Sequence, residues 1–498
     1  MMEPDGTTGK EAGFSLLILS ISLAVFMSSL DATIVTIALP AISEAFRISS
    51  TAVSWVATIY LLVMAGCVLV FGKIADIVGF RKIFIAGFAL FTLGSLCCGT
   101  LPDLTGSFLT LIGSRVLQAI GGAMMTAIAP AMITTFIPMD RKGKAMGVVM
   151  TFAALGTAIG PAIGGILTQY LSWHWIFFIN MPVGIAAILL GLKVVPGTAG
   201  SGTMSGFDRT GAVLIFVGLA SLLVVVSEGD DAGWTSPAIL VLAAVAIIAL
   251  SWFVRHERGA ADPLLDLRLF ASSNFAVTNL LFALVFFSFS GISYLLPFYL
   301  KYVRNFDTSS AGLILTSLSF AMMAAGILSG VSLIRLGAKK LCIAAGIFLS
   351  AGYFLMTRLH TDTHAGYVVL CLVLIGFGLG LMVTPASTLI LNSVARSRQG
   401  MISSLTSLER FAPQTLGIAL FNLVFIQGVL TIAANHEVTR SSPAAMQLKV
   451  LTAGFDLAFL VSFLLGLVIL ALAIMVREEI HPDYRGKTAS DEPPAGLL

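Results

Sequence analysis

Charged side chains inside long apolar runs are the first clue to what this chain does, and four of them carry the argument. They are Asp31, Arg115, Glu409 and Arg410. On insertion scales, a charged side chain at the centre of a lipid bilayer costs about 2.5 to 3.5 kcal/mol. Such a group persists only with a partner, with access to water or with a function. We therefore expect these four residues to form the working site.

Asp31 and Arg115 form the first candidate pair. Asp31 lies in the outer half of the first apolar run and is the only acid inside the predicted spans of the first half of the chain. A nearby arginine favours the ionised carboxylate, whereas loss of water favours the protonated form. This balance predicts that Asp31 couples protons or binds a cationic substrate. A purely structural pair with Arg115 is the alternative.

Glu409 and Arg410 form the second candidate cluster. Neighbouring residues of a helix point about 100° apart, so these two side chains cannot pair well with each other. At most one of them needs to face a central cavity, and we favour Glu409 as a second titratable or cation-binding group. The alternative is a structural network with the polar neighbours Ser407, Gln414 and Thr415.

Composition indicates an integral membrane protein. Of the 498 residues, 57% are hydrophobic and only 11% are charged, with a mean hydropathy of +0.99. Soluble chains carry about 25% charged residues, so most of this surface is expected to face lipid. The net charge of +3 is small and spread along the chain, which argues against nucleic acid as a partner. No spacing suggests a zinc site, a catalytic triad or a phosphate loop, so we expect neither an enzyme nor a cofactor.

Fourteen apolar runs are each long enough to cross a bilayer, for which about 20 residues suffice. They cover residues 14–39, 51–71, 83–101, 106–133, 145–168, 175–195, 210–227, 237–254, 275–300, 310–334, 341–358, 366–390, 400–431 and 452–476. An even number of spans places both termini on one side. Most of the 28 Lys and Arg residues fall in alternate loops on that side, which predicts that both termini are cytoplasmic.

The loop after the second run is a tight, charged turn. Gly72 and Gly79 permit a sharp turn, Asp76 is placed to cap a helix or pair across the junction, and Arg81 with Lys82 favours the cytoplasmic side. We expect this turn to act in conformational gating.

The same turn occurs again later in the chain, which indicates a duplication. At a constant offset of 258 residues, Gly330, Gly337, Lys339 and Lys340 repeat Gly72, Gly79, Arg81 and Lys82, with Ile334 in the place of Asp76. Counting spans from these turns predicts an all-α protein of two six-helix bundles with two inserted helices. The predicted units are residues 1–200, 201–273 and 274–477, followed by a cytoplasmic tail at 478–498.

Several motifs resemble those of one family of transporters. They are the turn at 72–82, the first-helix segment Leu30–Pro40, the segment Arg115–Ala123 with Ala119 in place of a usual glycine, and the residues Gly156, Gly160, Pro161, Gly164 and Gly165. Together they resemble the major facilitator superfamily, in particular its branch of 14-helix drug/proton antiporters. The last set resembles the antiporter motif, which is typical of exporters. The second half of the chain matches less well.

The glycine row also has a plain physical interpretation. Gly156, Gly160 and Gly164 recur every four residues, so they share one helix face and let a neighbouring backbone come close, while Pro161 bends the helix. Close packing of two helices is enough to explain this row of glycines. A smooth contact between two bundles that move against each other would also need small residues on one helix face.

These observations and the resemblance together predict a secondary exporter that works by alternating access. Protons would move inward while lipophilic, in particular cationic, small molecules move outward across the cytoplasmic membrane. The alternative is a proton-coupled exporter dedicated to one lipid, metabolite or antibiotic.

Overall fold

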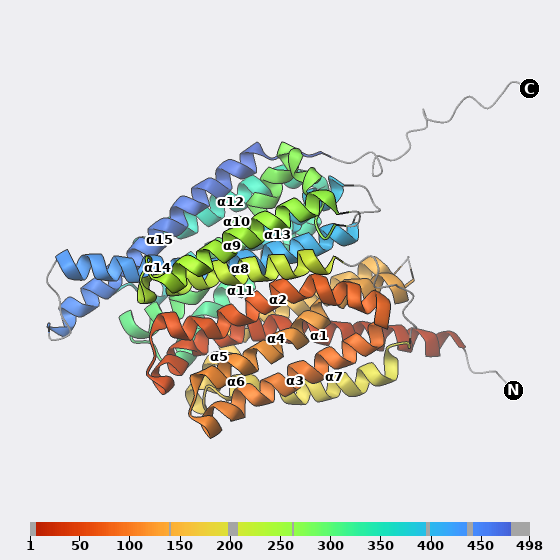
Figure 1. Ribbon diagram of the computed structural model, residues 1–498, viewed down its shortest axis with the longest axis horizontal. Helices are drawn as coiled ribbons and strands as arrows, with labels where there is room; N and C mark the ends of the chain where they lie inside the picture. The colour runs from red at the N-terminus through yellow and green to blue at the C-terminus, as the bar shows by residue number, and fades with distance from the viewer. Residues whose placement is uncertain are drawn as a thin grey trace, which may run out of the picture.

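The computed structural model describes residues 6–138, 141–197, 208–260, 263–394, 399–435 and 442–479. Within these ranges the regular structure is helical (Figure 1). The α-helices are α1 (Gly6–Phe46), α2 (Ser50–Val78), α3 (Phe80–Thr105), α4 (Phe108–Phe136), α5 (Lys142–Tyr170), α6 (Trp175–Phe178), α7 (Asn180–Val194), α8 (Arg209–Ala232), α9 (Pro237–Gly259), α10 (Ser273–Phe298), α11 (Thr308–Leu336), α12 (Ala338–Met356), α13 (Ala365–Asn392), α14 (Gln399–Asn435) and α15 (Ala444–Met475). A 3₁₀-helix, η2 (Leu267–Ala271), precedes α10, and a π-helix, η3 (Tyr299–Val303), extends it.

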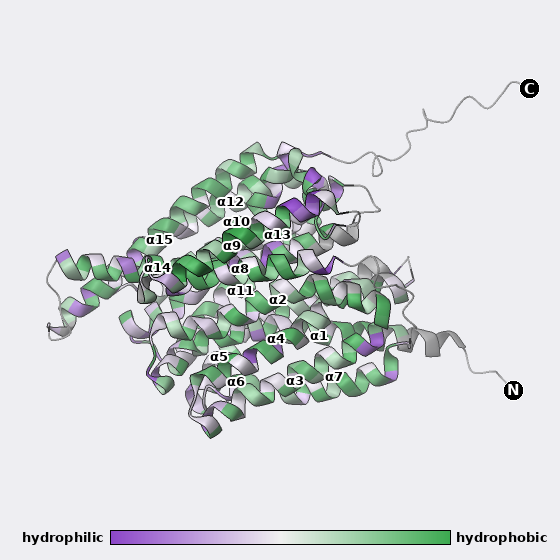
Figure 2. Cartoon of the chain, in the orientation of Figure 1, coloured by the Kyte–Doolittle hydropathy of each residue, from purple (hydrophilic) through white to green (hydrophobic). Residues whose placement is uncertain are grey.

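The described residues contain fourteen helical spans that are long and apolar enough to cross a membrane, which confirms the predicted number. The short α6 and the helix α7 together make the sixth span, Trp175–Val194. Hydrophobic residues follow the helices along their length, as Figure 2 shows. In α9, the outward-facing Val241, Ile247 and Trp252 are 62%, 67% and 58% exposed. Large apolar side chains with that exposure need lipid around them, so the chain is a multi-pass membrane protein.

Two bundles of six spans each repeat the same packing. In the first bundle, α1 to α7, helix α1 packs on α5 and α2 packs on α4. In the second bundle, α10 to α15, helix α10 packs on α14 and α11 packs on α13 in the same way. The bundles meet along two seams, α5 with α11 and α2 with α14, which a two-fold relation between the halves would exchange.

The inserted pair, α8 and α9, lies at one of these two seams. The two helices pack on each other, and α8 also contacts both α2 and α14. Leu223 of α8 is fully buried between Leu62 of α2 and Ala419 of α14. In addition, Trp55 of α2 donates a hydrogen bond of 2.6 Å from Nε1 to Glu228 of α8. The inserted pair is therefore attached to both bundles.

The repeated turn is visible in the backbone. Gly79 ends α2 with a φ of 99°, and Gly337 ends α11 with a φ of 80°, values that favour glycine over any residue with a Cβ. The N–H of each glycine donates to the carbonyl four residues earlier, Ala75 at 2.9 Å and Leu333 at 3.0 Å. The turns lie on the side of the molecule where α1 begins and α15 ends, which we call the terminal side. The opposite side is called the distal side.

Polar contacts join the two bundles on the distal side. Lys301 of η3 forms an ion pair of 2.7 Å with Glu44 at the end of α1. The Tyr294 hydroxyl donates to the Ser50 carbonyl at 2.6 Å, and the Thr308 N–H donates to Gln169 Oε1 at 3.2 Å. These contacts hold the distal ends of the bundles together in this structure.

The glycine row of α5 packs against α1, within the first bundle. A Cβ on Gly156 would lie 2.6 Å from the Phe26 carbonyl oxygen, and one on Gly164 would lie 2.7 Å from the Ile34 carbonyl oxygen. Gly165 instead faces the second bundle, where its Cβ would lie 2.6 Å from the Thr308 carbonyl oxygen. Gly156 and Gly164 therefore serve close helix packing inside the first bundle. Gly165, in contrast, lies at the seam between the two bundles.

This packing gives a direct test with a control on the same helix. We expect Gly156→Ala to destabilise the protein by about 1 to 3 kcal/mol, because the new methyl group would press on the α1 backbone. Gly147→Ala is the control, since a Cβ there meets nothing within 4 Å; it should be neutral or stabilising by up to about 1 kcal/mol through helix propensity. Thermal unfolding of both variants in detergent measures the difference, and equal melting temperatures would contradict close packing at Gly156.

Candidate functional site

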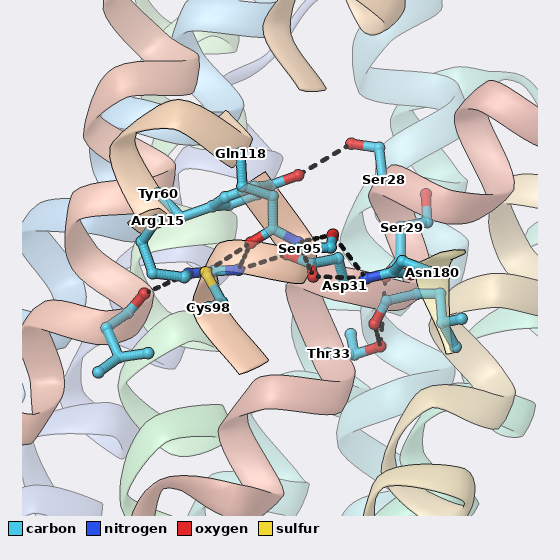
Figure 3. Close-up of polar contacts among 12 residues, drawn as sticks. Ser28, Ser29, Asp31, Thr33, Tyr60, Ser95, Cys98, Arg115, Gln118 and Asn180 are labelled. Atoms are coloured by element: carbon cyan, nitrogen blue, oxygen red, sulfur yellow. Dashed lines mark hydrogen bonds and ion pairs between the residues drawn. The ribbon is translucent and has the colours of Figure 1, made fainter. Parts of the chain in front are cut away.

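Asp31 lies at the centre of a buried polar network in the first bundle (Figure 3). Its side chain is 0% exposed, midway along the first span. Arg115 Nη1 of α4 donates to Asp31 Oδ2 at 2.7 Å, and Gln118 Nε2 donates to Oδ1 at 2.7 Å. Asn180 Nδ2 of α7 also donates to Oδ1, at 3.3 Å. Both carboxylate oxygens of Asp31 therefore have hydrogen-bond donors although the side chain is fully buried.

Arg115 is held from several directions. Its Nε donates to the Val56 carbonyl of α2 at 2.9 Å, and its Nη1 also donates to Gln118 Oε1 at 2.6 Å. The guanidinium carbon lies 4.3 Å from the ring centroid of Tyr60, which adds a cation–π contact. With its side chain 1% exposed, Arg115 has a charged partner on one side and an aromatic face on another.

Close approach of α3 to α4 makes this network possible. A Cβ on Gly94 would lie 2.5 Å from the Gln118 backbone nitrogen, and one on Gly121 would lie 2.3 Å from the Phe91 backbone nitrogen. The adjacent Ser95 then reaches Gln118, whose Nε2 donates to its hydroxyl oxygen at 2.8 Å. Sequence reasoning missed Gln118 and Asn180 as partners of Asp31, and it missed Ser95, whose hydroxyl oxygen accepts from both amides. The spacing of three residues between Arg115 and Gln118, which puts them on one face of α4, was the available signal.

A cavity lies between the two bundles, beside this network. It is lined by residues of α1, α2, α4 and α5 from the first bundle and of α10, α11, α13 and α14 from the second. The centres of water molecules can occupy about 80 Å³ of it, which is room for several waters. Arg115 lines the cavity, whereas Asp31 lies behind Arg115 and outside the lining. The cavity would have to widen to admit a molecule the size of a drug.

The structure reverses our expectation for Glu409 and Arg410. Arg410, Gln414 and Ile418 recur every four residues and form the cavity-lining face of α14. Glu409 is not in the lining. It stands two helical turns before Leu416, which packs beside the cluster of Leu62, Leu223 and Ala419 at the seam with α2 and α8.

The carboxyl group of Glu409 also lacks a hydrogen-bond donor at one of its two oxygens. Its Oε2 is buried and has no hydrogen-bond partner. The proposed network of Glu409 with Gln414 is not present, since Gln414 is on the cavity-lining face.

The expected gating residues lie away from the cavity, at the terminal side. Arg81 donates from Nη2 to the Leu192 carbonyl at the end of α7, and Lys82 is exposed. The equivalent turn in the second bundle has a similar attachment, because the Lys339 N–H donates to Glu478 Oε1 at 2.7 Å. Gly72 has open space beside it. The side chain of Asp76 lies outside the described residues.

The fold and the site define a membrane transporter. Two bundles of spans enclose a cavity with buried charge in its wall, and substrate sites of such proteins lie between the halves near the bilayer midplane. In the described part of the chain no cluster of His, Cys, Asp and Glu is suited to hold a metal ion. Residues 21–418 match the family model of the Major Facilitator Superfamily, and the chain belongs to that superfamily.

Known proteins support this assignment. The chain is similar to the riboflavin transporter RibZ of Clostridioides difficile, with 32% identity over 83% of this chain and 89% of that protein. It is also similar to the multidrug resistance protein Stp of Mycobacterium tuberculosis, with 31% identity over 88% and 80%. Among solved structures, a D-xylose-proton symporter matches with a TM-score of 0.64, 15% identity, and coverage of 93% of this chain and 98% of that one. The last likeness shows a shared fold.

A double-mutant cycle tests the strength of the Asp31–Arg115 pair. Removing one partner leaves the other unpaired inside the membrane, so Asp31→Ala and Arg115→Met should each destabilise the protein by about 3 to 5 kcal/mol. The double variant should be clearly more stable than the sum of the single effects predicts. The measurement is denaturant unfolding in detergent.

The control for this cycle is the Glu44–Lys301 pair on the distal side, whose side chains are 54% and 25% exposed. There, Glu44→Gln and Lys301→Met should couple by less than about 1 kcal/mol. Additive effects at Asp31 and Arg115 would show that the buried pair is energetically unimportant.

Glu409 gives a second test at the site. Because Glu409 lies outside the cavity lining and its Oε2 has no partner, Glu409→Gln should leave selectivity between cationic and neutral compounds unchanged and should not lower the melting temperature. Glu228→Met is the comparison at the same seam, and it should lower the melting temperature because it removes the oxygen that accepts a hydrogen bond from Trp55. A selective loss of cationic compounds in Glu409→Gln would return Glu409 to the substrate site.

Proposed function

We propose that this protein is a proton-coupled secondary exporter of lipophilic small molecules that works by alternating access. One observation carries the proposal: the fully buried carboxylate of Asp31 is paired with Arg115, and Arg115 lines the cavity between the bundles. A titratable group with a single cationic partner, placed directly behind the cavity wall, is what proton coupling requires.

In this mechanism the proton acts through Arg115. While Asp31 is ionised, it holds the Nη1 of Arg115 against α1 at the cavity wall. A proton on Asp31 removes the anion, and Arg115 then loses its charged acceptor. The cavity wall therefore differs between the ionised and the protonated form of Asp31, and this difference couples proton binding to substrate binding.

Alternating access needs elements that open and close at the two ends. The distal contacts of Glu44, Ser50 and Gln169 close one end in this structure, and we propose that they separate when the protein releases substrate. We further propose that the turn containing Gly72, Asp76, Gly79, Arg81 and Lys82 gates the terminal end. The basic turns lie on the terminal side, which favours the cytoplasm for that side and the cytoplasmic membrane as the location.

The identity of the substrate is a separate part of the proposal. Of the two relatives described above, one is named for riboflavin and the other for multidrug resistance. Both broad and dedicated export are thus represented among proteins of similar identity. The cationic substrates predicted from the sequence find little support in the cavity, because the charged side chains that line it are two arginines.

Proton coupling is tested with Asp31→Asn in proteoliposomes. The probes are riboflavin, the cationic dye ethidium and the neutral dye Nile red, and the compound that the unaltered protein moves uphill most strongly is used. Asp31→Asn should abolish transport driven by a proton gradient, because it removes the titrating group. It should still exchange labelled for unlabelled probe without a gradient, since that exchange needs no proton.

Two further variants make this test decisive. Asp31→Glu keeps a carboxylate and should retain coupling with a shifted pH profile. Asp103→Asn is the matched control, because Asp103 is a 66% exposed acid whose Oδ1 lies 3.1 Å from His174 Nε2, away from the cavity lining. It should behave like the unaltered protein. Uphill, gradient-driven transport by Asp31→Asn would refute the role of Asp31.

A further inference from the structure

The charge inside the cavity is uneven. Two of the residues that line it are cationic, Arg115 and Arg410. Arg115 is neutralised by Asp31 at 2.7 Å. Arg410 forms no ion pair with any described carboxylate, and its guanidinium instead lies 5.8 Å from the ring centroid of Phe286 and 5.7 Å from that of Phe411. The cavity therefore has one uncompensated positive charge.

Arg410 is also accessible from the cavity. Its side chain is exposed although α14 crosses the membrane at this point, because it borders the open space between the bundles. Arg410 lies five residues after Leu405, the first residue of the span Leu405–Asn435, which is about 7.5 Å of helix length from the terminal end of that span. A ligand that enters the cavity meets this charge directly.

The electrostatics of such a group favour one class of ligand. Water screens charge poorly in a narrow cavity within a membrane, so an unpaired guanidinium repels cations and attracts anions much more strongly than it would in solution. Guanidinium also matches the geometry of a carboxylate, with two parallel N–H donors for two oxygens. The cation–π contacts at 5.7 and 5.8 Å are long, so an anion can replace them at little cost.

The rest of the lining fits an aromatic body. Phe286, Phe289 and Tyr294 of α10 and Tyr60 of α2 present rings to the cavity. Gln414 lies one helical turn from Arg410 on the same face and adds an amide. Aromatic walls around a few polar groups are typical of sites for planar organic molecules.

We propose that Arg410 is the anion-binding group of the cavity and that the substrates are lipophilic aromatic compounds with an acidic group. This inference rests on the proposed function, because it specifies which class of substrate that exporter carries. The binding preference itself is a property of the cavity and needs no proton gradient.

The test uses three probes that share one aromatic system, anthracene, and carry an anionic, a neutral or a cationic group. They are anthracene carboxylate, anthracenemethanol and anthracenylmethyl-trimethylammonium, and their fluorescence reports binding to the purified full-length protein in detergent. The unaltered protein should bind the carboxylate about tenfold or more tighter than the ammonium compound, as expected for one charge-assisted contact. Arg410→Gln should remove this preference, whereas Arg410→Lys should keep most of it.

Arg358→Gln is the matched control. Arg358 also lies over a ring, 5.5 Å from the centroid of Phe354, but it is exposed beyond the end of α12 and outside the cavity lining. This variant should bind all three probes like the unaltered protein. Melting temperatures of all variants show whether each one is folded, and Arg410→Lys keeps the test valid if Arg410→Gln is unstable.

The outcomes separate this inference from the proposed function. Tighter binding of the ammonium probe, equal binding of all three probes, or no binding of the carboxylate overturns the inference. Strong binding of the alcohol alone also overturns it, because hydrogen bonding without charge would then explain recognition. A preference for the carboxylate in a protein that fails to use a proton gradient would leave the inference standing and refute proton coupling.

Discussion

Neutralising one arginine inside the membrane is the constraint on which the first bundle depends. Arg115 brings a permanent charge into the bilayer, and four helices contribute to its accommodation. Asp31 supplies the counter-charge from α1, and Val56 with Tyr60 supplies a carbonyl and an aromatic face from α2. Asn180 of α7 completes the environment of the carboxylate. The positions of α1, α2, α4 and α7 relative to one another are therefore set by polar contacts as well as by packing.

The two halves of the chain share a plan but use it differently. Gly160 of α5 and Gly417 of α14 hold equivalent places, each against the first helix of its own bundle: a Cβ would lie 2.1 Å from Thr33 Oγ1 in one and 2.2 Å from Ser290 Oγ in the other. The first bundle has a row of such glycines and a neutralised charge. The second has Gly417 of α14 and Gly291 of α10 at this contact in place of a row on one helix, and its cavity charge, Arg410, is uncompensated among the described residues.

Most of the fold could be predicted from the lengths of the apolar runs and from the spacing of the glycines. Fourteen spans and the repeated turns at Gly79 and Gly337 could be predicted because each depends on local residues, on a run of apolar side chains or on a backbone angle that favours glycine. Asp31 and Arg115 could be paired for a similar reason, since few other charges lie within the spans.

The orientation of α14 could not be predicted in this way. Which of Glu409 and Arg410 faces the cavity depends on the rotation of the helix about its axis, and α2, α8 and α10 set that rotation by packing against it. The partners Gln118 and Asn180 were missed for a related reason. Polar amides are common in helices, and only the close approach of helices distant in sequence shows which of them meet.

The place of the inserted pair makes the two seams between the bundles mechanically unequal. At the α5–α11 seam, small residues such as Gly165 and Gly312 bring two backbones into direct contact, so one surface can slide on the other. At the α2–α14 seam, Leu223 of α8 is wedged against Leu62 and Ala419. A rotation of one bundle against the other would have to break the contacts of Leu223 with Leu62 or with Ala419. In the proposed alternating-access cycle, the α5–α11 seam should therefore move more easily than the α2–α14 seam, where α8 must repack.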